Sequence, residues 1–240
     1  MGKPRLLVAL DFDGTLAPIA RRPEAARLSK AMRAALRALA ARADVRVAVV
    51  SGRALGDLRA KVGLERPAYA GNHGLELSAG AWHWTHPGLR GRRRPLRRAA
   101  EDAKAMCRMA PGAWVEDKGA TFSVHVRGVK DLRTESRLRS GLAAAVRRAG
   151  GLDLRSGKRV YEVRPRLAWD KGRAVELLRR HLAPGAACVY VGDDATDEDV
   201  FRRLMGMGLT VKVGPGRTAA AYRVAGPAGV RRLLGRLLLA

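Results

Sequence analysis

Short apolar runs alternate with longer stretches of helical spacing along the first third of the chain. The apolar runs end in acids, serine or glycine, as buried parallel strands do; they are residues 5–10, 45–50 and 68–70. Two stretches with Leu and Ala at helical spacing lie between them, at residues 28–43 and 54–62, and Ser29 is a candidate N-cap. Strand, helix and strand in this order predict right-handed βαβ units on a parallel sheet. Residues 75–77 and 82–84 then predict a hairpin about Gly80.

The pattern changes in the middle of the chain. Helix, two strands, helix and two strands are predicted there, with turns about Gly119 and Gly157; the ranges are 97–109, 113–118, 121–127, 132–149, 152–155 and 159–164. Strand and helix alternation returns after Asp170, with helices to His181 and Met205 and strands over 187–191 and 210–213. We therefore expect an α/β protein with a Rossmann-like core over residues 1–94 and 167–240 and an inserted, smaller αββαββ cap over 95–166.

Three short motifs each follow a predicted strand. They are Asp11-Phe12-Asp13-Gly14-Thr15, Ser51-Gly52-Arg53 and Gly192-Asp193-Asp194-Ala195-Thr196-Asp197. Loops at the carboxyl ends of parallel strands gather at one edge of the sheet, where ligands bind. A single Asp-x-Asp after a strand is common in caps and turns, but the three motifs in this order, joined by Lys171 at the start of a helix, predict one active site.

Several carboxylates in one crevice repel one another unless a divalent cation lies among them. Hard oxygen ligands with room for water and a phosphate oxygen suit Mg²⁺. We predict that Asp11, the main-chain carbonyl of Asp13, and Asp193 bind it, with Asp197 as a support; whether Asp194 or Asp197 touches the metal stays open.

Asp11 and Asp13 are too close in sequence to be redundant. We expect Asp11 to attack phosphorus and form an aspartyl-phosphate, and Asp13 to give a proton to the leaving oxygen and later take one from water. Ser51 would bind the phosphate and Lys171 would neutralise its charge. Gly14 supplies a tight turn, Thr15 offers hydroxyl and amide donors, and we also assign Gly52 and Arg53 to substrate binding.

The formal net charge of the 240-residue chain is +25, which raises the possibility of nucleic-acid binding. Residues 90–98 form the densest basic run and contain no aromatic residue on which a base could stack. A general arginine bias on solvated helix faces is the simpler interpretation, and a basic mouth that attracts a phosphorylated substrate is the functional one. We expect no nucleic-acid partner.

Several other classes of protein do not fit the sequence. Cys107 and Cys188 lack metal-ligand or disulfide spacing, so we expect two inert thiols. No apolar stretch approaches the roughly 20 residues that a membrane span needs. The apolar run after the basic start meets Asp11 without a cleavage site, which indicates a first strand instead of a secretion signal. We expect a cytoplasmic protein, a monomer with no membrane partner.

The motifs resemble those of the haloacid-dehalogenase (HAD) superfamily of phosphotransferases over essentially the whole chain. The insertion is similar to the C2B-type cap of its sugar-phosphatase branch. Within that branch the chain resembles the trehalose-6-phosphate phosphatase family. Further segments carry this resemblance; they are Ala70–Glu76, Val115–Lys118, Ser123–Arg127, Glu162–Pro165 and Gly192–Asp199. Phe12 and Val126 stand where tyrosine is more usual in the family, and neither carries the chemistry.

The resemblance implies which residues recognise the sugar. In the cap they are Glu116, Lys118, Arg127 and Glu162. A pair of cross-strand ion-pairing residues is an alternative interpretation of Glu116 and Lys118, and a packed strand histidine is one for His125. Asn72 and His73 would line the site beside Ser51, although their turn also fits simple hairpin punctuation.

The implied function is Mg²⁺-dependent hydrolysis of trehalose 6-phosphate, a small sugar phosphate, in a free-standing form without an attached glycosyltransferase region. Alternatives of the same build act on sucrose phosphate or mannosyl-phosphoglycerate, and only cap residues separate them. A basic nucleic-acid-binding protein with a vestigial core is a further alternative, which predicts strongly salt-dependent binding.

Overall fold

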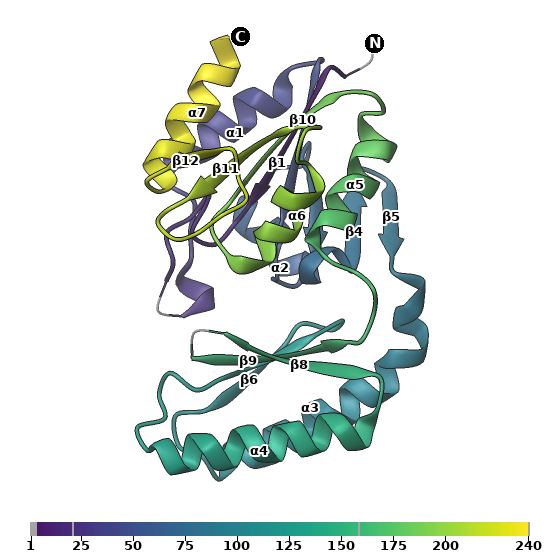
Figure 1. Cartoon of the computed structure of the whole chain (residues 1–240), viewed down its shortest axis with the longest axis vertical. Coiled ribbons are helices and arrows are strands. Elements are labelled where there is room, and N and C mark those ends of the chain that lie inside the picture. The colour runs from purple at the N-terminus through teal and green to yellow at the C-terminus, as the bar shows by residue number, and fades with distance from the viewer. Residues whose placement is uncertain (1–3, 21, 158, 240) are drawn as a thin grey trace. The chain divides into compact units, whose positions relative to one another are not determined.

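The apolar runs of the first part of the chain form strands, as their pattern predicts. The computed structural model describes residues 4–20, 22–157 and 159–239 (Figure 1), so the first three residues of the N-terminal segment lie outside the described residues. The elements in this part are β1 (Leu6–Asp11), η1 (Pro23–Ala25), α1 (Lys30–Ala41), β2 (Val45–Val50), α2 (Leu55–Val62), β3 (Ala68–Gly71), η2 (Asn72–Gly74), β4 (Glu76–Ala79) and β5 (Trp82–Thr85). Ser29 caps α1 as expected, since its side chain accepts a hydrogen bond from the main-chain nitrogen of Met32 at 3.1 Å.

The last part of the chain returns to the same sheet. Its elements are α5 (Lys171–Leu182), β10 (Ala187–Gly192), η4 (Ala195–Asp197), α6 (Glu198–Arg203), β11 (Leu209–Val213), β12 (Tyr222–Val224) and α7 (Pro227–Leu239). The strand order is β12-β11-β10-β1-β2-β3-β4-β5. The pairs from β12 to β3 are parallel, and β4 pairs with β3 antiparallel. The first strand of the chain therefore lies between β2 and β10.

The alternating side chains of β1 divide the core into two layers. Val8 and Leu10 pack with buried residues of α1, α2 and α7, whereas Leu7 and Ala9 pack with those of α5 and α6. Figure 1 shows α1 and α7 side by side. Helices on both faces explain why the central strands are apolar almost throughout.

The insertion has its own sheet and its own core. Its elements are η3 (Pro87–Arg92), α3 (Arg93–Arg108), β6 (Trp114–Asp117), β7 (Phe122–His125), α4 (Leu132–Ala149), β8 (Leu152–Gly157) and β9 (Val160–Pro165). The strands pair antiparallel in the order β6-β7-β9-β8, and one face packs against buried residues of α3 and α4. The predicted α/β fold class and the αββαββ order are thus confirmed. Residues 85–168 form one compact unit and the remaining residues form another; the functional boundaries near 95 and 166 stay a prediction.

Two features differ from the expected elements. The helix expected over 97–109 begins four residues earlier, at Arg93; Pro95 falls in its first turn, where a proline is tolerated because its missing N–H would have no partner in the helix. The last strand and helix, β12 and α7, were not predicted. Strand β12 has three residues, two of them exposed, so it lacks the apolar run that predicts a strand. Helix α7 begins at a proline and buries Val230 and Leu234 at helical spacing, and this pattern in the sequence does indicate a helix.

Both cysteines are free thiols in the structure. Burial raises the pKa of Cys188 to about 11 and also raises the pKa of Cys107. Both groups are therefore protonated at neutral pH, in agreement with the expectation of inert thiols. Across the described part of the chain, every helix is too short or too polar to cross a bilayer.

Helix α4 provides a test of the separate core of the insertion. Leu142 is fully buried and Leu132, on the same helix, is 76% exposed. We expect Leu142→Ala to lower the free energy of unfolding by about 2–5 kcal/mol because it leaves a cavity, and Leu132→Ala to change it by less than about 0.5 kcal/mol. Urea unfolding followed by circular dichroism measures both, and equal losses would contradict this packing.

Candidate active site

The three motif loops lie next to one another at the carboxyl edge of the large sheet. Asp11 ends β1, Ser51 follows β2, and Asp193 follows β10. Since β1 pairs with both β2 and β10, the predicted gathering of these loops is what the strand order requires.

A buried lysine lies between two buried carboxylates at this edge. Lys171 Nζ is 2.7 Å from Asp11 Oδ1 and 2.9 Å from Asp197 Oδ1, and the three side chains are at most 6% exposed. Asp170 sets the position of Lys171, because its side chain caps α5 by accepting a hydrogen bond from Arg173 N at 2.8 Å. Burial alone would lower the pKa of Lys171, but the charges of Asp11 and Asp197 raise it above its ordinary value. Lys171 is therefore a fixed positive charge beside Asp11.

Asp197 is held on both of its oxygens. Oδ1 accepts hydrogen bonds from Lys171 and from the Tyr190 hydroxyl, the latter at 2.6 Å, and Oδ2 accepts from Asp194 N at 2.9 Å. Burial opposes ionisation, yet Lys171 and Tyr190 lower the pKa of Asp197. Asp197 is thus ionised and fully engaged, which suits the expected supporting role.

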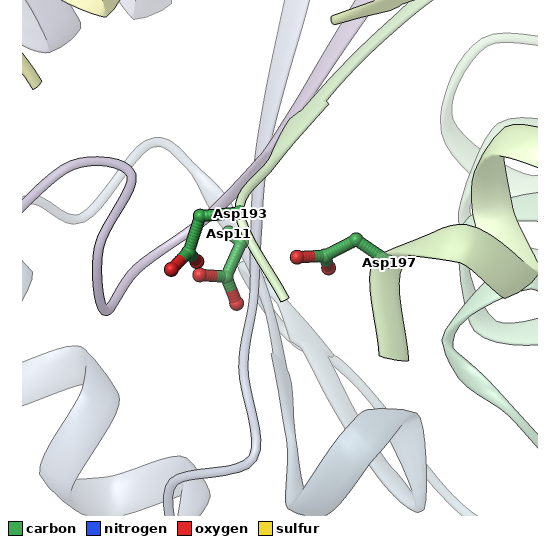
Figure 2. Close-up of side chains that lie close together, drawn as sticks. All are labelled: Asp11, Asp193 and Asp197. Atoms are coloured by element: carbon green, nitrogen blue, oxygen red, sulfur yellow. The ribbon is translucent and has the colours of Figure 1, made fainter. Parts of the chain in front are cut away.

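Three carboxylates approach one another closely enough to share a cation. Asp11, Asp193 and Asp197 each offer one carboxylate oxygen, and these three oxygens lie within 4.8 Å of one another. Figure 2 shows the carboxyl groups of Asp11 and Asp193 side by side, with Asp197 directed toward them from the start of the next helix. Carboxylate oxygens are hard donors, so this set fits a divalent cation such as Mg²⁺. Asp11 and Asp193 belong to the predicted ligand set; the role of the Asp13 carbonyl stays a prediction.

Burial and mutual repulsion act on the same carboxylates. Burial first, and then Asp197 and Asp193, hold the pKa of Asp11 well above its ordinary value, against the influence of Lys171. Burial and then Asp197 raise the pKa of Asp193 to about 6. Lys171 and Lys212 lower these pKa values without offsetting the burial and mutual repulsion of the carboxylates, so a further positive charge would be stabilised here.

Gly14 and Thr15 lie against Asp193. A side chain at Gly14 would place its Cβ 2.0 Å from Asp193 Oδ2, and the residue has a φ of +80°, so both space and backbone require glycine. Thr15 Oγ1 donates to Asp193 Oδ1 at 3.5 Å, the outer limit of a hydrogen bond. On the other side, Lys212 Nζ donates to the main-chain oxygen of Asp193.

The Arg53 side chain is paired within the protein. Its guanidinium donates to both oxygens of Asp13, at 2.7 and 2.8 Å, and to Asp57 at 2.7 Å. Ser51 is 2% exposed, and its hydroxyl accepts from Arg53 N at 3.3 Å. Arg53 therefore orients the Asp13 carboxylate, a contact that sequence motifs did not reveal.

The Asn72–Gly74 turn is fastened to the Ser51–Arg53 loop. Asn72 N donates to Arg53 O at 2.7 Å and His73 N donates to Ser51 O at 2.9 Å. Both residues have left-handed φ values, 50° and 57°, a conformation that asparagine and histidine adopt more often than most residues with a side chain. A Cβ on Gly52 would lie 2.7 Å from the His73 ring, so the two loops touch. The turn is thus held against the Ser51–Arg53 loop, and its role in lining the site stays a prediction.

The predicted sugar-binding residues lie on the sheet of the insertion. Glu116 is on β6 and Glu162 on β9; Lys118 and Arg127 closely follow β6 and β7 in the chain. Lys118 Nζ is 3.7 Å from Glu162 Oε1, and His125 Nε2 is 2.7 Å from Glu116 Oε2. The other predicted site residues belong to the first unit, so the structure groups each set within its own unit.

Some residues at the site were missed from sequence. Lys212 is a buried charge within an apolar strand, and such a break in pattern could have marked it. Tyr190 lies in an apolar run where tyrosine is ordinary, and nothing in the sequence sets it apart.

Charge removal tests the buried ion pairs. Lys171→Met would leave two buried carboxylates without their cation, so we expect a loss of about 3–5 kcal/mol in the free energy of unfolding at neutral pH. Lys30, exposed on the first turn of α1, offers a matched control, and Lys30→Met should cost less than about 0.5 kcal/mol. Urea unfolding would compare the two, and similar small losses would refute the pairing.

The raised pKa of Asp193 predicts a pH dependence of stability without metal. Because the pKa rises from 3.8 unfolded to about 6 folded, this group's contribution is fully present below about pH 4 and is lost as pH rises through about 6. Asp193→Asn should therefore exceed the native chain in stability by about 2 kcal/mol near pH 7.5 in EDTA, and by much less near pH 4. Urea unfolding at both pH values checks this. An equal difference in stability at the two pH values would contradict the raised pKa of Asp193.

The chain is similar to known proteins along nearly its whole length. The profile of the trehalose-phosphatase family matches residues 9–227. An uncharacterized glycosyl hydrolase of Mycobacterium tuberculosis is 41% identical over 249 residues, covering 97% of this chain and 18% of its own length. A trehalose-phosphate phosphatase of Mycobacterium marinum is 37% identical over 247 residues, covering 98% of this chain and 62% of its own. The chain thus spans less than two thirds of these relatives.

A solved structure resembles the whole fold. The crystal structure of a trehalose-6-phosphate phosphatase related protein superposes with a TM-score of 0.87 and 26% identity, covering 97% of each chain. The C-terminal domain of the Candida albicans trehalose-6-phosphate phosphatase has a TM-score of 0.83 at 24% identity over 98% of this chain and 92% of that one, which shows the same fold.

Proposed function

Because this chain belongs to the trehalose-phosphatase family, we propose that it is a phosphatase that releases phosphate from trehalose 6-phosphate. The observation that carries the proposal is the buried pairing of Asp11 with Lys171 beside Asp193, at the carboxyl edge of the parallel sheet. A carboxylate with a fixed cation beside it is suited to attack an anionic phosphate group. The mycobacterial relative named as a trehalose-phosphate phosphatase supports the choice of sugar.

The proposed reaction has two steps. An oxygen of Asp11 attacks phosphorus, the bond from phosphorus to the sugar oxygen breaks, and Asp13 gives its proton to that oxygen as trehalose leaves. Water then attacks the phosphorus of the aspartyl-phosphate while Asp13 takes up a proton, which releases inorganic phosphate and restores Asp11. Throughout, Lys171 offsets negative charge beside Asp11.

Arg53 constrains the acid step. Its guanidinium donates to both carboxylate oxygens of Asp13, at 2.7 and 2.8 Å. Since both oxygens are engaged, we propose that Asp13 turns from Arg53 when it protonates the leaving oxygen. Ser51, beside this pair, is the proposed phosphate ligand, and Thr15 a proposed donor.

The proposed metal ligands are Asp11, Asp193 and the main-chain carbonyl of Asp13, with Asp197 and Lys212 orienting them. Mg²⁺, when bound, would supply positive charge that offsets the clustered carboxylates and the phosphate. Asp197 holds Lys171 in place, and Lys212 holds the main chain at Asp193.

We assign sugar recognition to the sheet of the insertion. Carboxylates accept hydrogen bonds from sugar hydroxyls, which suits Glu116 and Glu162, while Lys118 and Arg127 suit the phosphate. Asn72 and His73 are proposed to contribute from the first unit, beside Gly52.

A substrate panel tests the proposal. We expect EDTA-sensitive phosphate release with Mg²⁺ that is at least about tenfold faster in kcat/KM for trehalose 6-phosphate than for sucrose, glucose or mannose 6-phosphate. EDTA-sensitive activity that favours another sugar phosphate would support the metal-dependent mechanism and contradict the assignment of trehalose 6-phosphate as the substrate. No release from any of the four would overturn both.

A matched pair of variants accompanies the panel. Asp11→Asn should reduce kcat by at least about 10³-fold because it removes the nucleophile. Asp44, which precedes β2 at the opposite edge of the sheet and pairs with Arg42, serves as the control, and Asp44→Asn should keep full activity. Substantial activity in Asp11→Asn would contradict the assignment of Asp11 as the nucleophile.

A further inference from the structure

The sheet of the insertion has one apolar and one polar face. Val115, Phe122, Val124 and Val163 pack with the buried residues of α3 and α4. Since successive side chains of a strand alternate, Trp114, Glu116, Ser123, His125 and Glu162 belong to the opposite face. This polar face therefore carries two carboxylates, two rings and a hydroxyl in one array.

Two aromatic rings are stacked at one end of the array. Trp114 and His125 are directly opposite in the β6–β7 register, and their ring centroids are 4.1 Å apart at an interplanar angle of 11°. Trp114 is 37% exposed, the highest value among the rings of this face. Stacking on His125 fixes the plane of the indole while part of it stays open to a ligand.

The same histidine also fixes a carboxylate. His125 Nε2 lies 2.7 Å from Glu116 Oε2, so one ring stacks on Trp114 and hydrogen-bonds to Glu116. The two side chains are only 18% and 22% exposed, which limits competition from water for this contact. A carboxylate whose rotamer is already fixed loses less conformational entropy when it binds a hydroxyl.

The array continues across the neighbouring strand. Ser123 is in register with Glu116 on one side and with Glu162 on the other, and it is 2% exposed. Two strand spacings separate the carboxylate-bearing strands, a width of about 10 Å, which matches one or two pyranose rings. The ring pair thus adjoins a row of hydroxyl acceptors.

We propose that Trp114, backed by His125, is a stacking platform for a pyranose ring of the substrate, and that His125 is the positioning residue for Glu116. A pyranose presents a C–H face that packs on an aromatic plane and ring hydroxyls that donate to carboxylates. Aromatic plane and acceptor lie next to each other here and are held by one side chain. This assignment rests on the proposed function and names a specificity residue for it.

The chain contains a matched control for this pair. Trp82 stacks on His181 with centroids 4.0 Å apart at 21°, in the first unit, where Trp82 packs against the core. The two pairs share their chemistry but not their surroundings. Loss of the Trp82 ring therefore reports what a Trp–His stack contributes without a sugar role.

The experiment compares a sugar substrate with one that lacks a sugar. Trp114→Ala should raise KM for trehalose 6-phosphate about tenfold with little change in kcat, and change kcat/KM for p-nitrophenyl phosphate less than about twofold. Thermal melting first checks that both variants are folded. Trp82→Ala should then change neither KM for trehalose 6-phosphate nor kcat/KM for p-nitrophenyl phosphate by more than about twofold. Equal losses on the two substrates, or no loss in Trp114→Ala, would overturn the platform.

A second pair of variants separates positioning from stacking. His125→Ala should raise KM for trehalose 6-phosphate at least as much as Trp114→Ala does, because it removes the contact to Glu116 as well. His125→Gln can still donate to Glu116 and should recover part of that loss. No recovery by glutamine would overturn the positioning role.

The outcomes distinguish this assignment from the proposed function. If the native chain prefers another sugar phosphate, the choice of trehalose 6-phosphate fails, and selective loss on that sugar in Trp114→Ala still supports the platform. If trehalose 6-phosphate is preferred and Trp114→Ala retains that preference, the platform alone fails. If no substrate is hydrolysed, binding of unphosphorylated trehalose measured by calorimetry decides: binding that Trp114→Ala weakens supports the platform, and absence of binding overturns it.

Discussion

The placement of Lys171 between Asp11 and Asp197 is the constraint on which the core of this protein depends. Removing three charges from water is costly, and their attraction offsets that cost only when geometry and hydrogen bonds are complete. The Tyr190 hydroxyl and the Asp194 amide complete them at Asp197. The strand order β2-β1-β10 and the capped start of α5 bring these groups together, so fold and site depend on the same contacts.

The two sheets have different designs and so offer different surfaces. The parallel sheet is covered by helices on both faces, and its useful chemistry is confined to the loops at its carboxyl edge. The antiparallel sheet packs one face on α3 and α4, and the alternate side chains on its other face include Glu116 and Glu162, which we propose for recognition. The carboxylates proposed for the reaction and those proposed for recognition therefore lie on separate sheets.

Local signals predicted most of the fold but only part of the site. The apolar run ending at Asp11 and the cap at Ser29 are set by neighbouring residues, and both were predicted correctly. The predicted start of α3 was wrong by four residues because Pro95 lies within the first turn of the helix and not before it. The pairing of Arg53 with Asp13 and the bond from Tyr190 to Asp197 depend on which loops meet in space. Spacing within one motif contains no information about such contacts.

The central position of β1 has a consequence for synthesis on the ribosome. This strand is made before both of its neighbours in the sheet; β2 can cover one of its edges soon afterwards, but the other neighbour, β10, begins only at Ala187. Until then an apolar strand has an open edge, and Asp11 lacks Lys171, which follows it by 160 residues. The insertion, a compact unit of residues 85–168, can complete its fold during this interval. The order of synthesis thus delays the closure of the edge at Asp11 until β10 and the Asp193 loop have been made.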